Sequence, residues 1–251
     1  MLDLELWRQY VADLNCEPLF VTVSGAHLYG FESPDSDVDL RGAHRLPLEQ
    51  VVGLAVGEET FERSGIHAGI EVDLVSHDVG KYFRLLVRNN GYVLEQIFSP
   101  LVVVGQDLLD RLRPVAARCI TRHHYHHYKG FYFTQRKLLE KSDPPTVKSA
   151  LYAYRVLLTG IHLLETGEVE AHLPRLNERF SLPGIDDLIA AKVTEQADLP
   201  VDLAAHLSRL DGLAERLEAA HAQSRLPADR DTAAVNDLLV ELRLAGLRAE
   251  K

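Results

Sequence analysis

The stretch of residues 24–42, SGAHLYGFESPDSDVDLRG, decides the fold of this chain. It follows an apolar, β-branched run, LFVTVS at residues 19–24, which stops at Gly25 and predicts a buried strand that ends in a turn. Its end, DVDLRG at residues 37–42, alternates acidic and non-acidic side chains, a pattern typical of a second strand. The stretch therefore predicts two short strands joined by a loop rich in Gly, Ser, Pro and Asp.

Two carboxylates on the second of these strands, Asp37 and Asp39, are the first candidates for a functional site. Residues two apart on a strand share one face and lie about 7 Å apart along the backbone, so these like charges repel each other. A hard divalent cation, Mg²⁺ or Mn²⁺, would relieve the repulsion. A short Asp-x-Asp pattern also occurs on ordinary solvated strand faces, and on the residues alone that alternative stays open.

A further acidic strand is predicted at residues 69–76, GIEVDLVS, where Glu71 and Asp73 share one face. Gly25 lets backbone N–H groups approach a phosphate because it has no Cβ atom. A phosphate cradle, a pair of metal ligands and a third carboxylate are what metal-assisted phosphoryl or nucleotidyl transfer needs. Either Glu71 or Asp73 can supply the third carboxylate on this pattern.

The rest of the chain predicts helices and a change of composition near residues 100–115. Helical spacing of apolar residues is found at 3–14 and from residue 77 to the Asn-Asn-Gly break at 89–91. Pro and Gly signals then separate helices at about 92–98, 106–119, 121–141, 145–167, 184–197, 201–223 and 232–248. We therefore expect the α+β class, with a small mixed β-sheet domain at residues 1–110 and a helical domain at residues 111–251.

The charge balance limits the partners of this protein. The chain has 251 residues and a formal net charge of −10, which argues against a broad electrostatic grip on duplex nucleic acid. An anionic partner would need a local basic pocket or a metal bridge. No run approaches the ~18 consecutive apolar residues of a membrane span. The N-terminal residues carry acids where a signal peptide carries a basic region, so we predict a cytoplasmic protein without a membrane partner.

A longer pattern within the same stretch resembles a known signature. It reads Gly25-x-x-x-Tyr29-Gly30-x-x-x-Pro34-x-Ser36-Asp37-x-Asp39-x-Arg41-Gly42. It resembles the DNA polymerase β-type nucleotidyltransferase superfamily. More narrowly, it is similar to predicted bacterial and phage nucleotidyltransferases, one branch of which is associated with RNA ligases and RNA repair. The resemblance covers roughly residues 20–165 and implies a nucleotidyltransferase domain at the N-terminal end.

The resemblance implies roles for particular residues. Asp37, Asp39 and Asp73 become the catalytic, metal-binding carboxylates, and Asp73 is preferred to Glu71. The nucleotide-binding residues on the signature become Gly25, Ala26, Ser36 and Arg41. Two other roles are open for Arg41. It can hold the aspartates in place, or it can form a purely structural salt bridge. Ala26 departs from the superfamily, which usually has Ser or Thr there, and the missing hydroxyl would weaken nucleotide binding by ~1 kcal/mol.

A second set of nucleotide-binding candidates lies in the predicted helix at 145–167. Lys148, Tyr152 and Arg155 are spaced i, i+4 and i+7, so they are predicted to share one helix face. Such a face can give cations to a triphosphate and an aromatic ring to a nucleobase. In the alternative interpretation, Lys148 and Arg155 are solvated cations and Tyr152 lies at the edge of the core.

The resemblance therefore implies a metal-dependent transferase. It would move a nucleoside monophosphate from a nucleoside triphosphate, such as ATP, to an acceptor hydroxyl and release pyrophosphate, with Mg²⁺ or Mn²⁺ as cofactor. An RNA or tRNA end is the favoured acceptor. A small molecule or a protein is an alternative acceptor, and an inactive relative that only binds a nucleotide or partner is a further alternative. The sequence does not give an oligomeric state.

Overall fold

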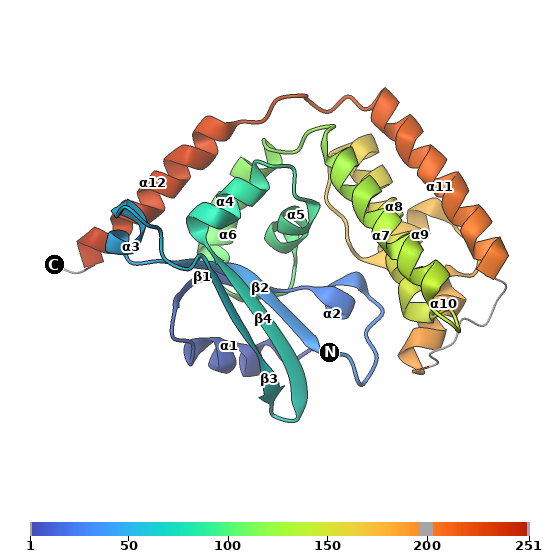
Figure 1. Cartoon of the computed structure of the whole chain (residues 1–251), viewed down its shortest axis with the longest axis horizontal. Helices are drawn as coiled ribbons and strands as arrows, with labels where there is room; N and C mark the ends of the chain where they lie inside the picture. The colour runs from blue at the N-terminus through green and yellow to red at the C-terminus, as the bar shows by residue number, and fades with distance from the viewer. Residues whose placement is uncertain (1, 196–202, 250–251) are drawn as a thin grey trace. The chain divides into compact units, whose positions relative to one another are not determined.

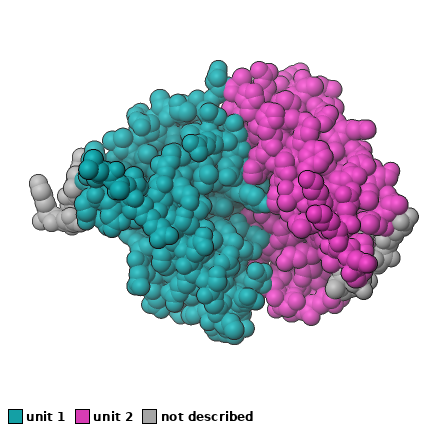
Figure 2. All heavy atoms as spheres, viewed as in Figure 1, with its two compact units in different colours: residues 1–25, 37–119, 229–251 teal, residues 26–36, 120–228 magenta. Residues whose placement is uncertain are grey.

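The computed structural model describes residues 2–195 and 203–249 of a chain that divides into two compact units (Figure 2). Unit 1 contains Met1–Gly25, Asp37–Cys119 and Asp229–Lys251. Unit 2 contains Ala26–Ser36 and Ile120–Ala228. The chain leaves unit 1 after Gly25 and returns to it at Asp37, so the signature stretch belongs to both units.

A five-stranded mixed sheet forms the centre of unit 1 (Figure 1). Its strands are β1 (Glu17–Val23), β2 (Val38–Arg45), β3 (Thr60–His67), β4 (Ile70–Asp78) and β5 (Val102–Val104), in the order β3-β4-β2-β1-β5. β2 and β4 are parallel, and the other three pairings are antiparallel. The α+β class with a mixed sheet, predicted from the sequence, is confirmed.

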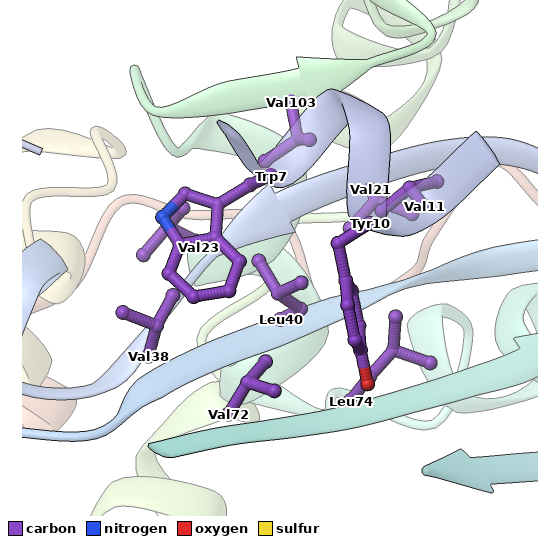
Figure 3. Close-up of a cluster of buried hydrophobic side chains, with 10 residues drawn as sticks. All are labelled: Trp7, Tyr10, Val11, Val21, Val23, Val38, Leu40, Val72, Leu74 and Val103. Carbon is purple, nitrogen blue, oxygen red and sulfur yellow. The ribbon is translucent and has the colours of Figure 1, made fainter. Parts of the chain in front are cut away.

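Helix α1 (Leu4–Ala12) covers one face of this sheet. It begins at Asp3, whose side chain accepts hydrogen bonds from the backbone N–H groups of Glu5 and Leu6, a cap that contributes about 1 kcal/mol. Its apolar side packs on alternate strand residues (Figure 3). The resulting core contains Trp7, Tyr10, Val11, Val21, Val23, Val38, Leu40, Val72, Leu74 and Val103. Because Val38 and Leu40 point into this core, Asp39 and Arg41 point to the opposite face of β2.

The remaining helices of unit 1 are α3 (Leu48–Val52), α4 (Val79–Leu86), α5 (Gly91–Phe98), α6 (Gln106–Ala117) and α12 (Thr232–Ala249). Helices α4, α5 and α6 lie on the side of the sheet opposite α1 (Figure 1). Phe20 of β1 meets Tyr82 of α4 edge-on there, with ring centroids 5.2 Å apart. The acidic side chain of β2, Asp39, therefore shares its sheet face with these helices.

Unit 2 is helical and is centred on α8. Its elements are α2 (Gly25–Tyr29), which starts at the last residue of unit 1, α7 (His124–Lys141), α8 (Val147–Thr166), α9 (Leu173–Phe180), α10 (Ile185–Val193) and α11 (Leu203–Gln223). Helices α7 and α11 pack against α8, where Gly160 leaves room for Tyr128 and Leu217. A buried hydrogen bond of 2.9 Å between the hydroxyl of Tyr154 and Nδ1 of His206 joins α8 to α11.

Most predicted elements match the structure, and the differences have a physical cause. The predicted strands at 19–24, 37–42 and 69–76 are β1, β2 and β4. Strand β3 was missed, because it is an edge strand whose side chains are mostly exposed and show no apolar alternation. Residues 196–197 and 201–202 of two predicted helices lie outside the described residues. No described helix has the length and apolar character needed to span a bilayer.

Candidate active site

Strand pairing places two of the predicted carboxylates opposite each other. In the parallel pair of β2 and β4, Asp39 is in register with Asp73. Residues in register on neighbouring strands project to the same face of the sheet. Both side chains are partly buried, with exposed fractions of 19% for Asp39 and 37% for Asp73. The pairing therefore forms an acidic pair that no local sequence pattern could establish, because the two residues are far apart in the chain.

The guanidinium group of Arg41 bridges the two carboxylates. Its Nη2 atom lies 2.6 Å from Oδ1 of Asp39 and 2.8 Å from Oδ2 of Asp73. Its Nη1 atom donates to the backbone carbonyl oxygens of Leu40, at 2.9 Å, and Asp73, at 2.6 Å. Arg41 thus neutralises part of the charge of an acidic pair that would otherwise repel.

Asp73 is held in its ionised form by its neighbours. Burial alone would raise the pKa of the Asp73 carboxyl. A hydrogen bond of 2.7 Å from the hydroxyl of Ser64 on β3, together with the charge and hydrogen bond of Arg41, outweighs burial and lowers that pKa below its usual value. Asp73 is therefore a carboxylate at neutral pH, which is the form that binds a cation.

Gly25 lies directly against the other carboxylate. Its φ angle is +62°, in the left-handed region that favours glycine, and a Cβ atom at this position would overlap the side chain of Asp39. The neighbouring Ser24 N–H donates to the carbonyl oxygen of Asp39 at 2.8 Å. The turn after β1 is thereby fixed against the acidic residue of β2, while the predicted approach of a phosphate to Gly25 stays a prediction.

Asp37 lies just before β2, and Glu71 lies near the start of β4. Asp37 is half-buried and immediately precedes β2, while Glu71 is exposed on β4. Across residues 2–195 and 203–249, no three His, Cys, Asp or Glu side chains are arranged to hold a metal ion. The structure therefore brings together Asp39 and Asp73, and the convergence of Asp37 with them stays a prediction.

The acidic pair nevertheless fits a hard divalent cation in its chemistry. Carboxylate oxygens are the ligands that Mg²⁺ and Mn²⁺ prefer. The position between Asp39 and Asp73 is already taken by a cationic group, the guanidinium of Arg41, which shows that it favours positive charge. Because Gly25 has no Cβ atom, Oδ2 of Asp39 lies directly against its backbone. Asp39 and Asp73 thus have the chemistry to hold such a metal, and the participation of Asp37 stays a prediction.

The loop that joins Gly25 to Asp37 belongs to unit 2. It contacts Lys192, a residue that the sequence analysis did not predict. Ala26 is buried in α2, and the hydroxyl of Ser36 accepts a hydrogen bond of 2.9 Å from the N–H of Ser33. Lys192 of α10 donates to the hydroxyl of Ser33 and lies 3.6 Å from Oδ1 of Asp35. Lys192 therefore anchors the loop, although nothing in its local sequence distinguishes it from a surface lysine.

The candidates on α8 differ in their burial. Lys148 is exposed, Tyr152 is half-buried, and Arg155 is fully buried. The ring of Tyr152 meets Tyr29 and Phe31 edge-on, and the guanidinium carbon of Arg155 lies 3.9 Å from the centroid of the Tyr29 ring. Tyr152 and Arg155 thus pack against the signature loop within unit 2, and their contact with a nucleotide stays a prediction.

Comparisons with known proteins test the family resemblance of the signature. A family model described as the RNA repair pathway DNA polymerase beta family matches residues 6–241. The chain belongs to this family. This confirms the resemblance predicted from the signature that runs from Gly25 to Gly42, and it identifies the chain as nucleotidyltransferase-like.

One relative and one solved structure are also similar. The uncharacterized protein MJ0002 of Methanocaldococcus jannaschii is 35% identical over 154 residues, which cover 61% of this chain and 63% of that protein. The match thus spans less than two thirds of that relative's length. The crystal structure of a nucleotidyltransferase-like protein from Exiguobacterium sibiricum aligns with 86% of this chain and 72% of its own, at 14% identity and a TM-score of 0.30.

Proposed function

We propose that this family member is a metal-dependent nucleotidyltransferase. It transfers a nucleoside monophosphate from a nucleoside triphosphate to an acceptor hydroxyl, an RNA or tRNA end, and releases pyrophosphate. The observation that carries the proposal is the in-register pair of Asp39 and Asp73, with Gly25 packed against Asp39. Family membership supports the transferase activity, and the family's association with RNA repair supports RNA as the acceptor.

The reaction needs charge stabilisation more than covalent help from the protein. Attack of the acceptor oxygen on the α-phosphorus forms one P–O bond and breaks the bond to pyrophosphate, and negative charge develops on the phosphate oxygens. A divalent metal held by Asp37, Asp39 and Asp73 would stabilise this charge and lower the pKa of the attacking hydroxyl. The protein's own part is to keep these carboxylates ionised and oriented.

Each residue of the site has a defined task in this proposal. Ser64 and Arg41 hold Asp73 in its ionised form. Gly25 fixes the start of the signature loop against Asp39, because its missing Cβ atom makes room for that carboxylate. Ala26 contributes only its backbone, because its side chain carries no hydroxyl group. Nucleotide binding at this point would therefore depend on backbone N–H groups.

A labelling experiment tests the transfer and the acceptor together. The full-length protein is incubated in Mg²⁺ with each of the four α-³²P-labelled triphosphates and with an RNA oligonucleotide, tRNA or a panel of small hydroxyl compounds. Label on RNA supports the proposal. Label on a small molecule or on the protein itself would identify that molecule as the acceptor instead of RNA. No label on any of them would favour an inactive relative that only binds a nucleotide or a partner.

Two variants make the labelling specific to the proposed site. Asp39→Asn keeps the shape of the side chain but removes its charge, and we expect transfer to fall at least about 10²-fold. Asp237→Asn removes an exposed carboxylate of α12 in the same unit and should leave transfer unchanged. Equal transfer by wild type and Asp39→Asn would contradict the proposal.

A further inference from the structure

The acidic pair of Asp39 and Asp73 is electrostatically incomplete without a cation. The two side chains are in register on neighbouring parallel strands, where like charges destabilise the sheet. In the structure, Nη2 of Arg41 lies within 2.8 Å of one oxygen of each carboxylate. A single positive group therefore serves both acids.

The position of Arg41 is fixed by more than these two ion pairs. Its Nη1 atom also donates to the backbone carbonyls of Leu40 and Asp73, which sets the plane of the guanidinium group. The Arg41 side chain is only 21% exposed. This geometry differs from a surface ion pair, in which two long side chains usually move in solvent and contribute little.

The same contacts leave little space for a metal. Oδ1 of Asp39 and Oδ2 of Asp73 face Arg41, Oδ1 of Asp73 accepts a hydrogen bond from Ser64, and Oδ2 of Asp39 lies against Gly25. A Mg²⁺ ion shared by both carboxylates would lie about 2.1 Å from their oxygens, where the guanidinium nitrogen now is. A Mg²⁺ ion and the guanidinium group of Arg41, both held at these oxygens, would repel each other strongly.

We infer that Arg41 is a resident counter-ion of the catalytic carboxylates, and that a divalent metal binds only when the guanidinium leaves them. This rests on the proposed function, because it concerns the same acids. The exchange keeps the acidic pair neutralised when the metal is absent. It also releases a guanidinium group next to the site, where it can bind phosphate oxygens through paired hydrogen bonds.

A Mn²⁺ titration monitored by electron paramagnetic resonance tests the exchange of Arg41 for a metal without measuring catalysis. The full-length protein is compared with Arg41→Lys and Arg41→Met. Arg41→Lys keeps a positive charge but lacks the planar fork that spans both carboxylates. We expect both variants to bind Mn²⁺ more tightly than wild type, by about fivefold for loss of a partly exposed ion pair. If Arg41 acted only as a nearby positive charge, Arg41→Lys would bind Mn²⁺ with the same affinity as wild type. That result would overturn the inference.

Two further measurements separate the possible causes. Arg8→Met removes a positive charge of α1 that pairs with Glu5, and it should not change Mn²⁺ affinity. In EDTA, Arg41→Met should melt at a lower temperature than wild type, and Mn²⁺ should raise its melting temperature by more than it raises that of wild type. An equal rise in melting temperature on adding Mn²⁺ to both proteins would contradict the exchange of Arg41 for a metal.

The result also distinguishes this inference from the proposed function. If Mn²⁺ binds wild type and both Arg41 variants with one affinity, Arg41 is not displaced, but the metal site stands. If millimolar Mn²⁺ binds none of the three proteins, the metal site itself fails, and the proposed function fails with it. Asp39→Asn should abolish the tight Mn²⁺ signal in either Arg41 background.

Discussion

The backbone of Gly25 lies against the carboxylate of Asp39, so closely that a Cβ atom at position 25 would overlap the Asp39 side chain. The left-handed φ of +62° at Gly25 places the turn there, and the backbone N–H of Ser24 ties the same turn to β2. A backbone position next to the acid, rather than a side chain, thus determines the shape of the site at this point.

Replacing Gly25 should damage both stability and transfer. Gly25→Ala places a side chain in left-handed backbone and against Asp39, and we expect the free energy of unfolding to fall by about 1–3 kcal/mol. Transfer should fall by about 10²-fold, because a carboxylate displaced by about 1 Å loses its alignment. Chemical denaturation and single-turnover rates measure the two effects.

Gly65→Ala is the matched control for this change. Gly65 lies in β3 of the same unit, and a Cβ atom there would meet open space. We expect this variant to fold and react like wild type. Normal transfer by Gly25→Ala would show that the contact with Asp39 has no part in the reaction.

The choice between Glu71 and Asp73 of β4 gives a second prediction. Asp73 pairs with Arg41 and Ser64, whereas Glu71 is exposed at the start of the strand. Asp73→Asn should reduce the single-turnover rate by about 10²- to 10³-fold, because the charge on the acidic pair is lost. Glu71→Gln should stay within about twofold of wild type, as is usual for an exposed substitution. The reverse order of effects would assign the third carboxylate to Glu71.

Lys192 should control the mobility of the signature loop. Its ammonium group donates to Ser33 and pairs with Asp35, both within unit 2. Lys192→Met removes this anchor, and amide hydrogen exchange at residues 31–36 should accelerate about five- to tenfold for loss of one such bond. Lys137→Met, on the exposed side of α7, is the control. Unchanged exchange in Lys192→Met would mean that the loop is held by its own hydrogen bonds.

The half-buried histidine His77 should make the protein sensitive to acid. Burial, followed by the charges of Lys81, His44 and Arg41, lowers the pKa of His77 from 6.5 to about 4. The unfolded chain therefore binds a proton more readily than the folded chain between these values, and stability falls as the pH drops from about 6.5 to about 4. Above pH 6.5 this contribution is fully present.

Denaturation at a series of pH values checks this prediction. His77→Gln should flatten the fall in the free energy of unfolding between pH 6.5 and 4, because Gln does not titrate. Part of the slope should remain, since burial, followed by the charges of His124 and Arg155, also lowers the pKa of His127 to about 4. An unchanged slope in His77→Gln would show that this imidazole does not govern the acid response.

Much of the fold and part of the site followed from local patterns. The alternation around Asp37 and Asp39, the strand that ends at Gly25, and the helical spacing of apolar residues depend on periods of two and 3.6 residues, which are visible in any short window. The polar edge strand β3 carries no such signal and could not be found in this way. The predicted boundary between domains at residues 110 and 111 stays a prediction.

The sequence by itself determined that a glycine turn precedes an acidic strand, which family this pattern belongs to, and that a further acidic strand follows. Only the tertiary structure decided which acid faces Asp39, that Arg41 binds both carboxylates, and that Lys192 reaches the loop at Ser33. The register between β2 and β4, and the contact between α10 and the loop, join residues that are distant in the chain. Such pairings are selected by the burial of whole faces against each other, which no local spacing encodes.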